Sequence, residues 1–161
     1  MQKLDHDFPF DPSYGYDLEA LLAVEPPPEP DDFAPFWQAR YERTLSVDTH
    51  PRLTPSAFRR PGFAVYDLAY GSTNGFEIGG WLLRPLGVAP GRGIITGHGY
   101  GGVPEPDFAL PLEDCVYLVP CFRGIGRSAR APISAEPRWH VLHDIHLRDG
   151  YLLGGCVEDV W

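Results

Sequence analysis

The stretch Gly93-Ile-Ile-Thr-Gly97-His-Gly-Tyr-Gly-Gly102 decides the fold of this chain. It joins a short run of β-branched residues, typical of a buried parallel strand, to a glycine loop that can turn sharply and bring main-chain N–H groups close to a ligand. A second apolar run, Val116-Tyr-Leu-Val119, follows after a connection that contains Phe108, Leu110 and Leu112. This connection is long enough for one short crossover helix. The two runs therefore predict neighbouring parallel strands of an α/β sheet.

Upstream of this stretch, the hydrophobic pattern has the two-residue period of β-strands. Apolar residues alternate with smaller or polar ones over 66–70 and again over 76–82, on either side of the segment Gly71-Ser-Thr-Asn-Gly75. The Asn-Gly step of this segment suits a tight turn between antiparallel strands. The sequence therefore predicts a β-hairpin before the parallel strands. At the other end, residues 151–161 have apolar residues at helical spacing and predict a further helix.

The first sixty residues are predicted to form a helical and coil extension, and residues 61–161 the α/β core. Asp17 is placed to cap a short helix, and a stiff acidic connector, Glu25-Pro-Pro-Pro-Glu-Pro-Asp-Asp32, follows it. Asp31 or Asp32 then caps a second helix with a strongly apolar face. That face consists of Phe33, Phe36, Trp37 and Tyr41, and we expect it to pack on the sheet.

Composition excludes several classes of function. The 161 residues carry a formal net charge of −9, which argues against binding to nucleic acid or to an anionic membrane surface. No run approaches the ~20 apolar residues of a membrane span, and the N-terminus lacks the apolar segment of a signal peptide. Cys115, Cys121 and Cys156 are predicted to be reduced core thiols. A cytoplasmic location is the expectation that follows.

The glycine loop also satisfies the pattern G-x-G-x-x-G, which in dinucleotide-binding proteins opens a helix that faces a pyrophosphate. Here Val103-Pro-Glu-Pro106 follows, and a proline disfavours helix in the residue before it. The acidic residue expected after the next strand is missing, although Arg123 there could favour a 2′-phosphate. An NADP-type nucleotide-binding half-domain that uses Gly97–Gly102 is therefore kept as an alternative, as is a non-catalytic interaction module.

Taken together, the motifs resemble the acetyl xylan esterase/cephalosporin-C deacetylase family of α/β-hydrolases. The resemblance rests on the order of five segments along the chain, which covers nearly everything from about Tyr14 onward. They are Asp32-Phe-Ala-Pro-Phe-Trp37, Gly79-Gly-Trp-Leu-Leu-Arg-Pro85, His98-Gly-Tyr-Gly-Gly102, Phe122-Arg-Gly-Ile-Gly-Arg-Ser128 and Tyr151-Leu-Leu-Gly-Gly-Cys-Val-Glu-Asp-Val160. The resemblance implies the N-terminal portion of an α/β-hydrolase fold and a serine esterase that removes acetyl groups from sugars or similar small esters.

The resemblance also implies roles for residues of the glycine loop. In this family the backbone N–H of the tyrosine after His-Gly helps to form the oxyanion hole, a role that falls on Tyr100 here. We expect His98, Gly99 and Gly101 to line the substrate site beside it. The family's catalytic histidine comes near the C-terminal end of the chain, so His98 is expected to support the loop rather than act as the base. No cofactor is implied.

The sequence departs from the family where the nucleophile should follow. The nucleophile elbow G-x-S-x-G is expected on the strand after the tail helix, yet no G-x-S-x-G occurs in this chain. Ser128 lacks the closing glycine, and Cys156 lies in a helix-like run without a preceding strand. We therefore expect a fragment that is truncated before the nucleophile strand and is inactive alone, because the serine, acid and histidine are absent. An uncovered apolar edge at Gly93–Gly97 would favour self-association or aggregation.

A histidine-rich segment has a spacing that could place two imidazoles on one helical face, as a metal site would need. His140, His143 and His146 follow one another at three-residue spacing, with Asp144 between them. A zinc site needs a closed set of three or four ligands, and the segment offers no cysteine or glutamate to complete one. We expect no metal, and interpret these histidines as part of a loop that crosses the mouth of the active site.

Overall fold

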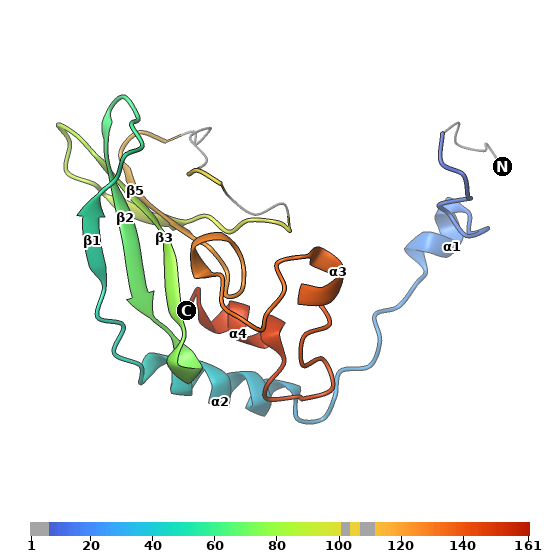
Figure 1. Cartoon of the computed structure of the whole chain (residues 1–161). Coiled ribbons are helices and arrows are strands. Elements are labelled where there is room, and N and C mark those ends of the chain that lie inside the picture. Colours follow the sequence, from blue (N-terminus) through green and yellow to red (C-terminus); the bar gives the residue numbers. More distant parts are fainter. Residues whose placement is uncertain (1–6, 101–103, 107–111) are drawn as a thin grey trace. The chain divides into compact units, whose positions relative to one another are not determined.

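The computed structural model describes residues 7–100, 104–106 and 112–161 (Figure 1). Phe108 and Leu110 of the predicted crossover, and Gly101 of the glycine loop, lie outside the described residues. The chain divides into two compact units, the first ending at Ala34 and the second beginning at Pro35. The division at residue 60 that the sequence suggested stays a prediction.

The first unit contains one short helix, α1 (Leu18–Leu22). As predicted, Asp17 caps it: the side chain accepts a hydrogen bond of 2.8 Å from the backbone N–H of Ala20. The helix buries none of its residues, and Leu18 and Leu22 are more than 70% exposed. Among the described residues of its unit, this short helix therefore has a local cap but no contact that buries any of its side chains.

Among the described residues, a five-stranded sheet forms the centre of the second unit, with the order β1-β2-β3-β5-β4. β4 and β5 pair in parallel, which confirms the predicted parallel pair, and the other neighbours are antiparallel. β1 was not predicted, because its four residues include a proline and lie on the exposed edge. The strands are β1 (Arg52–Pro55), β2 (Phe63–Gly71), β3 (Glu77–Pro85), β4 (Arg92–Ile95) and β5 (Cys115–Pro120).

The predicted hairpin is formed by β2 and β3, which pair along all nine residues of each strand. In the turn between them, Asn74 and Gly75 have φ values of 57° and 65°. These are left-handed conformations that asparagine and glycine adopt more readily than other residues, which is why the Asn-Gly step marked the turn correctly.

Close approach of β3 to its neighbours depends on two consecutive glycines. A Cβ at Gly79 would lie 2.7 Å from the carbonyl oxygen of Arg127, and one at Gly80 would overlap the carbonyl oxygen of Val119 on β5. Because neither position has a side chain, β5 and the turn of 3-10 helix at Gly126–Ser128 can both lie directly against β3.

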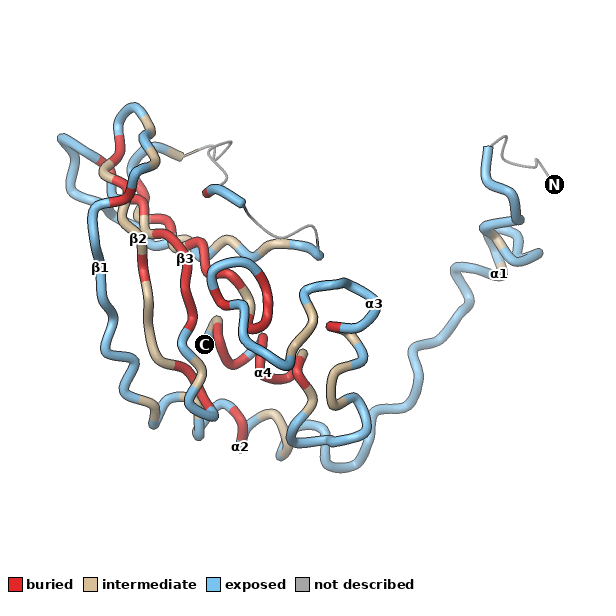
Figure 2. The backbone as a smooth tube through the Cα atoms, in the orientation of Figure 1, coloured by how far each residue is buried: buried red, intermediate tan, exposed pale blue. Residues whose placement is uncertain are grey.

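The main core lies on one face of the sheet (Figure 2), where the middle strands are buried. Alternate residues of each strand point to the same face, so the buried side chains recur at every second position. Trp81 is 1% exposed and packs edge-on against Phe58, with 5.9 Å between ring centroids. The members of the core cluster are Phe63, Val65, Trp81, Leu83, Cys115, Tyr117, Val119 and Cys121.

In the described part of the chain, three α-helices accompany the sheet: α2 (Phe33–Leu45), α3 (Pro137–His140) and α4 (Leu152–Glu158). The apolar face of α2 is present, but its ring contacts differ from the predicted packing on the sheet. Trp37 and Tyr41 meet Trp161 edge-on, with centroids 6.0 and 5.3 Å apart. Arg40, in the same face, is buried and pairs with Glu158 of α4 at 2.8 Å. This buried charge directs α2 towards the end of α4.

The parallel strand β4 lies at the edge of the sheet, and Ile95 on it is 47% exposed. The exposed edge expected for this strand is therefore observed. Within the described ranges, no helix is both long and apolar enough to cross a lipid bilayer.

Candidate active site

The loops that follow β4 and β5 lie beside one another, because the two strands are parallel and end at the same edge of the sheet. In open α/β sheets, ligands bind outside the carboxyl ends of the strands. The first loop carries His98 and Tyr100, and the second begins at Phe122 and Arg123. This edge is therefore the candidate site.

His98 joins the two loops. Its Nε2 lies 3.0 Å from the backbone nitrogen of Phe122, and its Nδ1 lies 2.8 Å from the carbonyl oxygen of Gly99. A backbone N–H can only donate, so Nε2 accepts and Nδ1 carries the proton. The ring also packs on Phe122 at 4.6 Å between centroids. With both nitrogens occupied, His98 has the geometry of a loop support.

Tyr100 is held from the other side by His140. The Tyr100 hydroxyl lies 3.4 Å from His140 Nδ1, and the two rings meet edge-on at 5.4 Å. His140 is 1% exposed and donates its Nε2–H to the carbonyl oxygen of Arg123 at 2.9 Å. Burial raises the pKa of the Tyr100 hydroxyl, which stays a neutral donor near neutral pH. Among the described residues, the backbone N–H of Tyr100 forms no hydrogen bond.

Behind the loops, Arg123 is buried with Asp159. Its Nε lies 3.1 and 2.9 Å from the two carboxylate oxygens, and its Nη2 lies 3.1 Å from each of the hydroxyls of Ser72 and Thr73. The Arg123 side chain is 3% exposed. It is therefore not available to a 2′-phosphate, and the structure gives no support to the nucleotide alternative.

A second buried carboxylate, Glu158, lies next to the first. It accepts hydrogen bonds from Arg40, Arg43 and Thr73. Burial raises the pKa of Glu158, but the hydrogen bonds from Thr73 and Arg43 and the two positive charges outweigh it, and the net pKa is lowered. We call Arg40, Arg43, Arg123, Glu158 and Asp159 the charge cluster.

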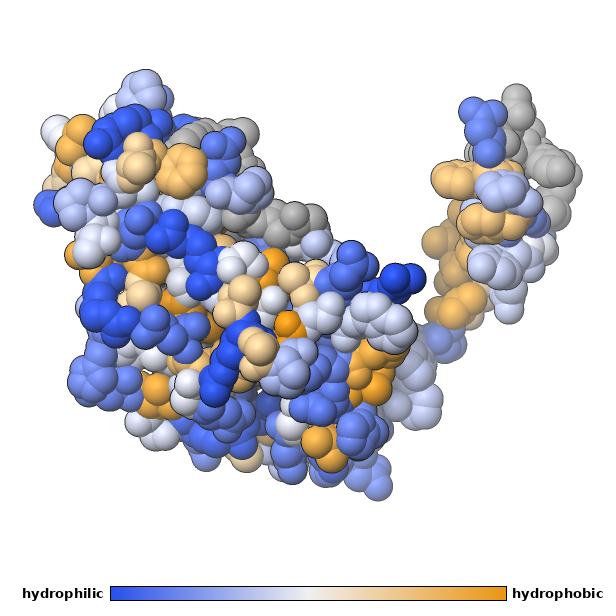
Figure 3. Space-filling view, viewed as in Figure 1, coloured by the Kyte–Doolittle hydropathy of each residue, from blue (hydrophilic) through white to orange (hydrophobic). Residues whose placement is uncertain are grey.

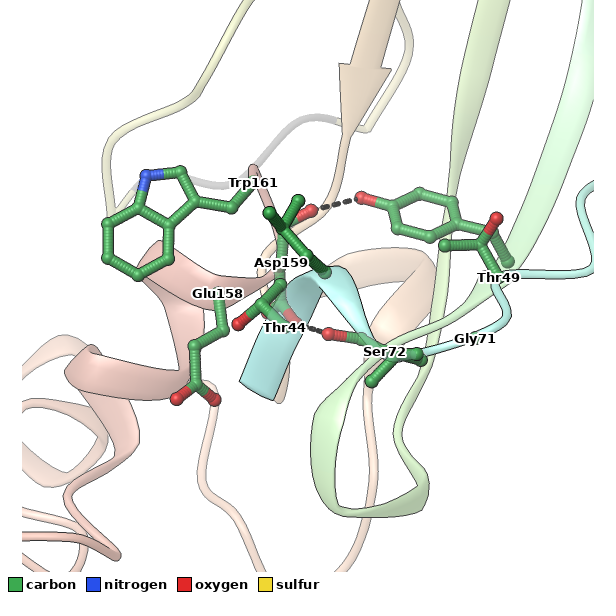
Figure 4. A pocket seen from close by; sticks show the side chains of 10 residues that line it. Thr44, Thr49, Gly71, Ser72, Glu158, Asp159 and Trp161 are labelled. Atoms are coloured by element: carbon green, nitrogen blue, oxygen red, sulfur yellow. Dashed lines mark hydrogen bonds between the residues drawn. The ribbon is translucent and has the colours of Figure 1, made fainter. Parts of the chain in front are cut away.

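A pocket of about 230 Å³ lies beside the charge cluster (Figure 4). The Tyr70 hydroxyl donates to the Asp159 carbonyl at 2.6 Å, and the Ser72 hydroxyl donates to the Asp159 carboxylate at 2.7 Å. Its polar walls are thus largely bonded to one another, which makes this pocket part of the scaffold. It is lined by Thr44, Leu45, Val47, Thr49, Tyr70, Gly71, Ser72, Glu158, Asp159 and Trp161.

The serine and the cysteine that the sequence analysis compared with a nucleophile elbow are structural. The Ser128 hydroxyl is buried between the Gly79 N–H and the Cys121 carbonyl oxygen, at 2.9 and 2.6 Å. Cys156 lies within α4, and burial raises the pKa of its thiol to about 12, so it carries no thiolate near pH 7. Cys115 and Cys121 are also buried free thiols, as predicted.

The histidine-rich segment splits into different environments. His140 is buried against Arg123 and Tyr100, whereas His143 lies 3.6 Å from Asp144 and His146 is exposed. In the described part of the chain, no three His, Cys, Asp or Glu side chains come together in a way that could hold a metal ion.

Sequence analysis missed the charge cluster as a unit. Charged residues in a helix are usually solvated, and Glu158 and Asp159 are separated by more than a hundred residues from Arg40. The available signal was their position at the end of an otherwise apolar helical run. The contact of His140 with Tyr100 could not be predicted from the sequence either, because the two residues are 40 positions apart.

This combination of a sheet with parallel strands, a glycine loop at the end of β4 and a buried helix after β5 is that of an α/β-hydrolase. A family model described as acetyl xylan esterase (AXE1) matches residues 17–109. The match covers more than half of the chain, and the chain therefore belongs to the acetyl xylan esterase family.

Solved structures support the fold. Acetyl xylan esterase 1 from Thermoanaerobacterium sp. JW/SL YS485 is similar over 82% of this chain, with a TM-score of 0.62 and 20% sequence identity. An acetyl xylan esterase from Paenibacillus sp. R4 is similar over 74% of this chain, with a TM-score of 0.55 and 21% identity. The chain spans 44% and 40% of the lengths of these two proteins. Comparison with curated proteins gave no match.

Proposed function

We propose that this chain carries the oxyanion-binding part of a serine carboxylic-ester hydrolase that removes acetyl groups from small acetylated sugars or similar esters. The observation that supports this most directly is the placement of Tyr100. It lies at the carboxyl end of a parallel strand, with its ring against the buried His140 and its loop fastened through His98.

Ester hydrolysis requires a hydrogen-bond donor that is already in place before the reaction begins. When a nucleophile attacks an ester carbonyl, the oxygen becomes negative and needs fixed N–H groups at about 2.7–3.1 Å. The backbone N–H of Tyr100 is the donor in this proposal. His98 and Gly99 line the substrate side of the loop, and Gly101, outside the described residues, belongs to the same proposed set.

By itself, the 161-residue chain is proposed to be inactive. Its sequence contains no G-x-S-x-G, and its buried Ser128 and Cys156 have no access to a substrate. Without nucleophile and base, only oxyanion and binding contributions remain. The purified chain should therefore not accelerate hydrolysis of p-nitrophenyl acetate above buffer, and a rate that survives replacement of its serines and cysteines would contradict this mechanism. A cytoplasmic location belongs to the same proposal and rests on the buried free thiols.

The oxyanion role is testable in a chimera. Residues 35–161 would replace the matching segment of the Thermoanaerobacterium acetyl xylan esterase, and turnover of p-nitrophenyl acetate would be measured. Tyr100→Pro removes the backbone N–H and should lower kcat by about 10²–10³-fold, as is typical for loss of one oxyanion donor.

Tyr100→Phe is the matched control, because it keeps the N–H and removes only the hydroxyl that reaches His140. This variant should lower kcat by no more than about tenfold, since the net value of a neutral hydrogen bond is about 1 kcal/mol. Equal losses in the two variants would contradict the backbone role, and a folded but wholly inactive chimera would contradict the proposed function itself.

A further inference from the structure

The segment around α3 buries a polar side chain and exposes apolar ones. His140, the last residue of α3, is 1% exposed, whereas Trp139 and Leu142 beside it are 56% and 49% exposed. Figure 3 shows hydrophobic residues at the surface of the second unit, among the hydrophilic ones. Burial of an imidazole is unfavourable unless its nitrogens form hydrogen bonds. The bonds that His140 forms must therefore account for its place inside the protein.

A glycine makes room for this imidazole. Gly124 follows Arg123 in the loop after β5 and has a φ of 87°. A Cβ at this position would lie 3.2 Å from both Cδ2 and Nε2 of His140, and it would overlap Ile133. Because glycine has no Cβ, the ring reaches the backbone, and its Nε2 donates to the carbonyl oxygen of Arg123 at 2.9 Å. In the neutral ring, Nδ1 is then left as a hydrogen-bond acceptor.

The acceptor nitrogen of His140 meets the hydroxyl of Tyr100, 3.4 Å away. On the other side of the ring, the residue that supplies the carbonyl oxygen is itself fixed. The Arg123 side chain is buried, and its Nε lies 2.9 Å from the Asp159 carboxylate. A continuous series of contacts therefore leads from the charge cluster through the backbone of Arg123 and the imidazole of His140 to Tyr100.

α4 holds the segment around His140 at a second point. The hydroxyl of Tyr151, directly before α4, donates to the carbonyl oxygen of Val141 at 2.9 Å. The backbone N–H of Leu152, the first residue of α4, donates to the carbonyl oxygen of His143 at 3.4 Å. His140 is thus attached to the scaffold through its ring and through the backbone on its C-terminal side.

We propose that His140 is a positioning residue of the esterase site, which transmits the fixed position of the charge cluster to Tyr100 and so directs the Tyr100 backbone N–H. This inference rests on the proposed oxyanion role of that N–H. A donor that is held in place needs no reorganisation when the oxyanion forms, whereas a mobile donor must be reoriented in the transition state. His140 is buried and has no access to a substrate. Its loss should therefore lower kcat and leave KM nearly unchanged.

The first test uses nuclear magnetic resonance on the full 161-residue chain. His140 should carry its proton on Nε2, and Tyr100→Phe should shift the Nδ1 resonance because the donor is removed. His140→Gln keeps an N–H that can reach the Arg123 carbonyl but removes the acceptor for the Tyr100 hydroxyl. The order parameter of the Tyr100 N–H should then fall from about 0.85 towards about 0.6, the values of rigid and flexible backbone. His146→Gln changes an exposed histidine of the same segment, and this matched control should behave as the wild type.

Two results of this first test would overturn the proposal. One is a proton on Nδ1 of His140, since that nitrogen could then not accept from Tyr100. The other is a Tyr100 order parameter that His140→Gln leaves unchanged. Tyr100→Phe alters a partly exposed residue, so the shift of the Nδ1 resonance remains measurable even if the substitution of the buried His140 prevents folding.

The second test measures turnover of p-nitrophenyl acetate in the chimera that contains residues 35–161. His140→Gln should lower kcat about five- to tenfold, as expected for one lost hydrogen bond, with KM unchanged within about twofold. When Tyr100→Phe is already present, the same substitution should lower kcat by no more than about twofold, because both changes remove the same contact. His146→Gln should be as active as the unmodified chimera.

The kinetic outcomes separate this inference from the proposed function. Equal losses of kcat from His140→Gln with and without Tyr100→Phe would show that His140 does not act through Tyr100, and would overturn the inference. A rise in KM at constant kcat would overturn it as well. The proposed function fails on a different result, namely a Tyr100→Pro chimera that keeps full activity.

Discussion

The charge cluster and the glycine loop lie at the same edge of the sheet, but they are held in very different ways. Arg123, Glu158 and Asp159 are each at most 4% exposed and linked by several charge-assisted hydrogen bonds. Tyr100, by contrast, is 38% exposed, and among the described residues its side chain forms one hydrogen bond, of 3.4 Å. The difference places stability in the cluster and leaves the Tyr100 side chain less firmly held, as is usual where a scaffold presents a binding segment.

The largest expected loss of stability comes from removing one charge of the charge cluster. Arg123→Ala leaves the Asp159 carboxylate buried without its partner, and should lower the free energy of unfolding by about 3–5 kcal/mol. Urea denaturation followed by tryptophan fluorescence would measure it. Arg52→Ala, which breaks the exposed pair with Glu77, is the control and should cost at most about 1 kcal/mol. Similar losses in both variants would remove the distinction between buried and exposed charge.

A smaller and pH-dependent change in stability is expected when the carboxylate of Glu158 is replaced. The folded-state pKa of Glu158 lies below its ordinary value of 4.5. Its contribution to stability is therefore fully present above about pH 4.5 and is lost as the pH falls through the lowered pKa. Glu158→Gln should lower the free energy of unfolding by about 2 kcal/mol at pH 7, and the gap between variant and wild type should narrow below pH 4.5. A gap that is constant down to pH 3 would show that the charge of Glu158 is not what matters.

The smallest effect is expected in the glycine loop. His98→Phe keeps a ring against Phe122 but removes the nitrogen that accepts its backbone N–H. Amide hydrogen exchange at Phe122 should accelerate about fivefold, which corresponds to a hydrogen bond worth about 1 kcal/mol, while global stability changes little. Exchange at Val119, in the middle of the sheet, is the internal reference. Equal acceleration at both amides would mean that His98 supports the whole sheet and not the loop alone.

Local patterns predicted much of the sheet. The hairpin of β2 and β3, the parallel strands β4 and β5, the helix at α4 and the cap at Asp17 each depend on residues that are close in sequence. The support role of His98 was expected from the family resemblance, because the family's catalytic histidine comes near the C-terminal end of the chain, and the hydrogen bond from the Phe122 N–H to its Nε2 is compatible with that expectation. The esterase resemblance came from motif order, and the family match agrees with it.

What the sequence did not predict depends on distant partners. β1 is short, and it is a strand because it pairs with β2 at the edge of the sheet. Arg40 lies in the apolar face of α2, and its burial depends on Glu158, 118 residues away, which pairs with its guanidinium. His140 likewise became part of the candidate site through its contacts with Tyr100 and Arg123. Contacts between residues so far apart in the sequence do not produce a repeating hydrophobic pattern, so a single sequence does not predict them.

The pair Gly79-Gly80 has a consequence for how this sequence can diverge. Both positions lie in a strand, where glycine is ordinarily a poor choice, but here any side chain would collide with backbone atoms that have no room to move. If every position of β3 is randomised and folded variants are selected, positions 79 and 80 should contain only glycine, whereas the exposed position 84 should accept many residues. The two glycines are thus diagnostic of this sheet geometry. A chain with side chains at both positions must have β3 farther from its neighbours, even if its loops are similar.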